Sequence, residues 1–131
     1  MSMTSFSVIP RSWGPSLHGV LRIMAAAAFM EHGTGKILGF PHLTGLDQMP
    51  AGLLVFTGLL ELIGGFLLLI GLFTRPVAFV LSGFMAAAYF MAHFPRDFFP
   101  ALNFGEPALL YCFVFLFLAA DGPGRWSVDK E

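Results

Sequence analysis

The chain has 131 residues, of which 56% are hydrophobic, 11% are charged and 16 are Phe. A soluble protein of this length would need more polar surface, so the composition predicts a membrane protein. The formal net charge of −1 gives no indication of a nucleic-acid partner, because such partners attract strongly basic proteins. With Cys112 as its single cysteine, the chain has no intramolecular disulfide. The length fits one domain.

Four apolar segments, separated by Pro, Gly and charged residues, predict a bundle of four transmembrane α-helices at about 16–38, 51–73, 77–94 and 105–120. A helix crosses the hydrocarbon core with about 20 apolar residues, whereas barrel strands would alternate in polarity over ~10 residues. The third and fourth segments are short for a full span, so we expect tilt or re-entrant packing there. The predicted organisation is a polar N-terminal segment (1–15) unlike a signal peptide, a transmembrane domain (16–121) and a C-terminal tail (122–131).

The basic residues predict the orientation of this bundle. If all four segments cross, Lys36 and Arg96 lie on one side of the membrane. The opposite side carries four basic residues: Arg11, Arg75, Arg125 and Lys130. Cytoplasmic loops are enriched in Lys and Arg, so we expect both termini in the cytoplasm and the longer loops, 39–50 and 94–104, on the outer side.

The first helix carries four polar side chains, Arg22, Glu31, His32 and Lys36. At ~100° per residue, Arg22, His32 and Lys36 share an arc about 80° wide, and Glu31 points opposite Arg22. Arg22 and Lys36 could extend along the helix to the two membrane interfaces, as long basic side chains do, and we adopt this interpretation for Arg22. Glu31 and His32 lie deeper, so we expect a functional or paired role for at least one of them.

Glu61 lies in the middle of the second apolar segment. A charged side chain at that depth costs roughly 2.5–3.5 kcal/mol on insertion scales, and no interface is within its reach. We therefore expect Glu61 to face the bundle interior. It is either a structural group paired with a neighbouring helix or an acid that exchanges protons and binds a ligand.

The second half of the chain adds further polar candidates. Tyr89 and His93 lie four residues apart and share a helix face, either as an interfacial aromatic pair or as part of a site. Glu106, after Asn103, is expected to act mainly as a favourable negative charge in the first turn of the fourth helix. A di-iron bundle requires Glu-x-x-His motifs, which the chain lacks, so we predict no metal site.

Small residues in the second and third segments predict close helix packing, because they let helix backbones approach each other. These residues are Gly58, Gly64, Gly65 and Gly71 in the second segment, and Gly83 with Ala87 in the third.

Taken in order, the motifs of the chain resemble the DoxX family of small bacterial four-helix membrane proteins. The resemblance covers nearly the whole chain beyond Leu21. It is carried by His32-Gly33 with Lys36, Phe40-Pro41, Glu61-Leu-Ile-Gly64-Gly65, Gly71-Leu-Phe-Thr74-Arg75, Ala88-Tyr89-Phe90 with His93, Asn103, Gly105-Glu106, and Gly122-Pro-Gly124. It implies a multi-pass protein of the bacterial cytoplasmic (inner) membrane. The polar motif residues that it implies are His32, Lys36, Glu61, His93, Asn103 and Glu106.

Members of the family have been described as quinol-oxidase or thiosulfate:quinone oxidoreductase subunits, so the resemblance implies a quinone ligand and a redox partner protein or respiratory complex. The chain shows no redox-centre site, so it would be a quinone-interacting subunit. Glu61 and Glu106 would exchange protons, and His32 or His93 would bond to a quinone carbonyl. A non-catalytic accessory or assembly protein and a small-solute transporter are the alternatives. The candidate site residues are Glu31, His32, Lys36, Glu61, Tyr89, His93, Asn103 and Glu106.

Overall fold

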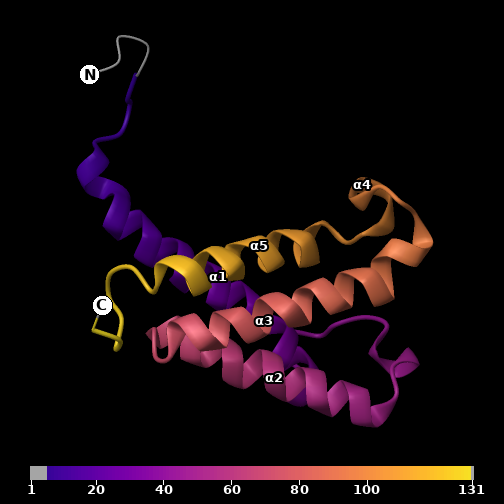
Figure 1. Cartoon of the computed structure of the whole chain (residues 1–131). Helices are drawn as coiled ribbons and strands as arrows, with labels where there is room; N and C mark the ends of the chain where they lie inside the picture. Colours follow the sequence, from indigo (N-terminus) through magenta and orange to yellow (C-terminus); the bar gives the residue numbers. More distant parts are fainter. Residues whose placement is uncertain (1–5, 131) are drawn as a thin grey trace.

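A computed structural model of the chain describes residues 6–130. Within this range the protein is entirely helical, without a β-strand (Figure 1). The α-helices are α1 (Gly14–Ile37), α2 (Ala51–Ile70), α3 (Thr74–Ala88), α4 (Pro100–Asn103) and α5 (Glu106–Asp121). A π-helical turn (Tyr89–His93) continues α3, and 3₁₀ turns occupy Arg11–Trp13, Leu46–Gln48 and Phe94–Arg96. The all-α class predicted from the sequence is therefore confirmed.

Proline and glycine determine where these helices begin and end. Proline stands in the first turn of α1, α4 and α5, where its missing N–H costs no hydrogen bond. At the other end of α2, Gly71 adopts a φ of 71°, and its N–H donates to the Leu68 carbonyl oxygen. This left-handed glycine ends the helix and starts the tight turn into α3.

The helices pack mainly as two pairs, α1 against α2 and α3 against α5, and the α2–α3 turn connects the pairs (Figure 1). The residues after α5, 122–130, form a tail at the end of the molecule opposite the longer loops (Figure 1). There the Arg125 guanidinium donates to Ser16 Oγ over 3.1 Å, and the Val128 N–H donates to the Ile70 carbonyl oxygen over 2.9 Å. The start of α1, the α2–α3 turn and the tail thus share one end.

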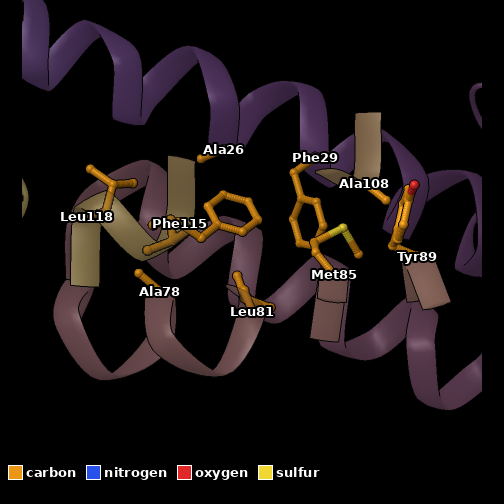
Figure 2. Packing of buried hydrophobic residues seen from close by; sticks show 10 residues of the cluster. Ala26, Phe29, Ala78, Leu81, Met85, Tyr89, Ala108, Phe115 and Leu118 are labelled. Atoms are coloured by element: carbon orange, nitrogen blue, oxygen red, sulfur yellow. The ribbon is translucent and has the colours of Figure 1, made fainter. Parts of the chain in front are cut away.

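The buried core is narrow and is built mainly from α1, α3 and α5, with Leu68 of α2 and Tyr89 of the π-helical turn added to it (Figure 2). Phe29 of α1 lies at its centre, with its ring edge-on to Phe115 at a centroid distance of 5.0 Å. Leu81 and Met85 of α3 close the core from the other side. Many large apolar residues instead lie on the outer surface, among them Phe56, Phe79, Leu110 and Phe113. Such an apolar exterior is stable in lipid and would promote association in water.

Two helices in the described range are long and apolar enough to cross a membrane, α2 (Ala51–Ile70) and the continuous helix Thr74–Arg96. The expectation that the third segment is short is therefore wrong, because the π-helical and 3₁₀ turns extend α3 to 23 residues. By contrast, α5 has 16 residues, about 24 Å of helix. α1 has 24 residues and carries the polar side chains described above.

Glycine contacts show where the helices approach most closely. A β-carbon on Gly64 would lie 2.9 Å from the Leu81 side chain of α3, and one on Gly58 would lie 2.9 Å from Ile37 of α1. The prediction of close packing at these positions is confirmed. For Gly83 it is wrong, because a β-carbon added to this exposed residue would meet no atom within 4 Å.

Candidate functional site

A cavity of about 220 Å³ lies between α1, α2, α3 and α5, near the end that carries the longer loops. Three polar residues line it, His32 of α1, Glu61 of α2 and His93 of the π-helical turn. Its apolar walls include Phe29, Met85, Phe104 and Tyr111. A dry cavity of about 150 Å³ is enough to hold benzene, so this cavity has room for a single substituted ring.

Glu61 is the most deeply buried acid of the site, with 5% of its surface exposed. Its Oε1 atom lies 2.9 Å from Lys36 Nζ, and that ammonium group also donates to Thr57 Oγ1 over 3.0 Å. This contact joins α1 and α2 as a buried ion pair. Lys36 therefore turns into the bundle toward Glu61 and does not extend to an interface.

Gly33 lets α1 and α2 approach closely enough for this ion pair to form. A β-carbon on Gly33 would lie 2.5 Å from the Leu62 backbone nitrogen and 3.0 Å from the Glu61 carbonyl carbon. The backbone of α1 thus crosses directly over the Glu61–Leu62 peptide. Three residues further along α1, Lys36 is on the same helix face and meets the Glu61 side chain. His32-Gly33 was part of the sequence pattern, but nothing in the sequence indicates which residue of α2 Gly33 contacts.

Asn103 is fully buried and holds the aromatic side of the site. Its Nδ2 group donates to Tyr89 Oη over 3.2 Å and to the Asp97 carbonyl oxygen over 3.0 Å, and its Oδ1 accepts the Gly105 N–H over 2.8 Å. Its carbonyl oxygen lies 3.0 Å from His93 Nδ1. A carbonyl can only accept, so Nδ1 is the donor, and Nε2 of a neutral His93 ring keeps a free lone pair.

The remaining sequence candidates lie outside the cavity. Glu31 and Glu106 are exposed, and neither lines it. Glu106 is the first residue of α5, where its charge suits the helix N-terminus. The structure thus brings His32, Glu61 and His93 together at the cavity, with Lys36 behind Glu61. Tyr89 and Asn103 lie beside His93. The Tyr89 and His93 ring centroids are 6.4 Å apart, and the Asn103 carbonyl oxygen accepts the hydrogen bond from His93 Nδ1.

Arg22 is a polar residue whose position the sequence interpretation placed wrongly. It is 0% exposed, so its charge is enclosed by protein instead of extending into an aqueous interface. Its guanidinium group donates to the carbonyl oxygens of Leu68 (2.9 Å), Arg125 (3.0 Å) and Trp126 (2.7 Å), and also to that of Pro123. The tail covers Arg22 and supplies three of these four acceptors, and α2 supplies the fourth, the Leu68 carbonyl oxygen. The Gly122-Pro-Gly124 motif indicates a turn, but it does not indicate which carbonyl groups face Arg22.

Asp129 of the tail fixes the turn between α2 and α3. Its carboxylate accepts the Phe73 N–H over 2.9 Å and the Thr74 N–H over 2.8 Å, at the start of α3. Partial burial opposes the charge, but the hydrogen bonds from Thr74 and Phe73 and the nearby Arg22 charge outweigh it, so the pKa of Asp129 lies below its usual value. Arg22 and Asp129 together attach the tail to the helical bundle, away from the cavity.

Comparison with known proteins identifies the family. A sequence model of the DoxX family matches residues 18–94. An uncharacterized protein of Haemophilus influenzae is 42% identical over 122 residues, covering 89% of this chain and 91% of the relative. The inner membrane protein YqjF of Escherichia coli K12 is 32% identical over 125 residues, covering 85% of this chain and 88% of the relative. No solved structure matches. The chain is therefore a helical membrane protein that belongs to the DoxX family.

Proposed function

We propose that the chain binds the ring of a quinone in the cavity formed by His32, Glu61 and His93, as a subunit of a membrane oxidoreductase. The observation that carries the proposal is the cavity itself: a space of about 220 Å³ lined by His32, Glu61 and His93 and by mainly apolar and aromatic walls. A lipophilic ring with two oxygen atoms matches such a site, because apolar walls bind the ring and a few polar groups orient it.

The proposed setting is the bacterial inner membrane, which the name of the Escherichia coli relative supports. In this arrangement α1 and α5 cross together with α2 and α3, and tilt compensates for the 16 residues of α5. The start of α1 and the tail share one end of the bundle, which an even number of crossings requires. The basic residues at that end favour a cytoplasmic position for it.

When bound, a quinone is reduced to a quinol by two electrons, which the partner redox protein supplies, and two protons. Glu61 would accept and release these protons, and its position in the cavity lining, beside the Lys36 ammonium group, supports this role. His93 distinguishes the two ligand states. Its Nδ1–H is committed to Asn103, so a neutral ring offers Nε2 as an acceptor for a quinol hydroxyl, whereas a protonated ring offers a donor to a quinone carbonyl.

The contact between Lys36 and Glu61 also supports a second candidate, a non-catalytic accessory or assembly protein. In that function the buried acid serves only to hold α1 and α2 together. Breaking a buried ion pair by removing one partner typically costs about 3–5 kcal/mol. A structural acid therefore affects the stability of the bundle, and an acid of the quinone site affects ligand binding beyond any effect on stability.

Equilibrium binding of a benzoquinone ring to the purified protein in lipid nanodiscs tests the proposal. We expect saturable binding to the wild type and at least tenfold weaker binding to Glu61→Gln and to His93→Ala. Asp47→Asn is the control, because Asp47 is exposed and does not line the cavity. Binding that is absent from the wild type, or equal in all variants, would contradict the proposal. Loss of stability in Glu61→Gln without loss of binding would favour the accessory function.

A further inference from the structure

A second hollow of about 370 Å³ adjoins the cavity on its outer side. It is a groove between α1 and α5, lined by Ala25, Glu106, Pro107, Leu110, Tyr111 and Val114. These two helices contact each other sparsely, whereas α1 packs closely on α2 and α5 on α3. The groove therefore lies where the wall of the bundle is thinnest.

The groove and the cavity are adjacent, because Pro107 and Tyr111 line both of them. These residues are four apart on α5 and share one face of the helix. The Tyr111 ring is stacked on Phe115 at a centroid distance of 5.6 Å and meets the edge of Phe29 at 5.4 Å. Tyr111 is thus held by its aromatic neighbours between the cavity and the groove.

We infer that this groove is the lateral passage for the apolar tail of a ligand whose ring occupies the cavity. The inference rests on the proposed function and specifies its ligand class, a quinone with a long alkyl or isoprenoid tail that enters from the bilayer. The cavity, at about 220 Å³, has room for the ring but not for such a tail, so the tail needs an opening in the bundle wall. The groove provides one, with Ala25, Leu110 and Val114 as apolar walls.

The groove lets the tail of the ligand through the bundle wall but adds little to the binding affinity of the ligand. Lipid tails are as apolar as a leucine side chain, so moving a tail from lipid into the groove gains little. In the wild type, a tailed quinone and the bare ring should therefore bind with similar affinities when both are referred to their concentration in the membrane. Blocking the groove should exclude the tailed ligand sterically and leave the bare ring bound.

Two tryptophan variants on α1 provide a matched test. Ala25→Trp fills the groove, whereas Ala27→Trp adds the same bulk on a nearly opposite face of the helix, where the residue is exposed and lines neither hollow. Leu110→Trp narrows the groove from α5 at a residue that is 64% exposed, so it leaves the core intact. The probes are a dimethoxy-methyl-benzoquinone without a tail and the same ring with a decyl tail, measured in nanodiscs by native mass spectrometry.

We expect Ala25→Trp and Leu110→Trp to weaken binding of the decyl quinone at least tenfold and to leave binding of the tail-less ring within twofold of the wild type. Ala27→Trp should change neither. Equal binding of both probes to every variant, or equal loss of both probes in Leu110→Trp, would overturn the passage while leaving the quinone site in place. If the wild type binds neither probe, the proposed function itself fails.

Discussion

Gly33 sets the distance between α1 and α2 beside the cavity, and its replacement by Ala should destabilise the bundle. The new β-carbon would lie 2.5 Å from Leu62 N and 2.8 Å from Leu62 Cα. Ordinary contacts of a β-carbon begin at 3.4 Å, so α1 would have to retreat by 0.9 Å (3.4 − 2.5) to remove the overlap. The atoms in its way belong to the backbone and cannot rotate aside.

Three effects determine the size of the destabilisation. Overpacking of this kind costs about 1–3 kcal/mol, and the higher helix propensity of Ala recovers up to about 1 kcal/mol. Movement of α1 also lengthens the 2.9 Å contact between Lys36 and Glu61 and so weakens this ion pair. Breaking a buried ion pair completely costs about 3–5 kcal/mol. We expect a net loss of about 1–3 kcal/mol in the free energy of unfolding.

Unfolding by sodium dodecyl sulfate in mixed micelles, followed by circular dichroism, measures this difference. Gly83→Ala is the matched control, because Gly83 is also inside a helix and a β-carbon there meets no atom within 4 Å. It should match the wild type or exceed it by up to about 1 kcal/mol. If Gly33→Ala is as stable as Gly83→Ala, the close crossing of α1 over Glu61 is refuted.

Three further predictions concern the buried charges and the tail. Lys36→Met should lower the unfolding free energy by about 3–5 kcal/mol, and the double variant with Glu61→Gln should recover most of this loss. If the effects of the two single variants simply add in the same assay, the ion pair is contradicted. Arg22→Met should release the tail from three carbonyl contacts, seen as faster amide hydrogen exchange in the tail alone; unchanged exchange would argue against the anchor. Because the folded pKa of Asp129 lies below its usual value of 3.8, its contribution is complete above that pH and is lost as the pH falls through the lower folded value. Tail exchange, corrected for the intrinsic rate, should therefore rise only in acid in the wild type, and Asp129→Asn should show the released tail already at neutral pH.

The helical class and the family could be predicted because they depend on patterns within the chain. Long apolar runs between prolines and glycines favour helices, and the burial of Glu61 follows from its distance to either interface. The helices after Ala88 were less predictable. The π-helical turn and the short helix α4 depend on Asn103, whose side chain and carbonyl bond to Tyr89, Asp97, Gly105 and His93, and these contacts are tertiary.

The partners of the charged residues could not be predicted for the same reason. Helix periodicity placed Arg22, His32 and Lys36 on one arc, but their actual partners belong to three different segments. Arg22 meets the tail, Lys36 meets α2, and His32 lines the cavity. Only the path of the tail and the crossing of α1 over α2 decide among these surroundings. Periodicity fixes the face of a helix but not the element that covers it.

The central claim is that the cavity holds a quinone ring beside Glu61. Its most direct test is mass spectrometry of organic extracts from gently purified protein, comparing the wild type, Glu61→Gln and Asp47→Asn, with co-purifying polypeptides identified in the same samples. We expect near-stoichiometric quinone in the wild type and in Asp47→Asn, and depletion in Glu61→Gln. Wild-type protein without enriched quinone, isolated with a reproducible partner chain, would contradict it and identify the protein as an accessory subunit.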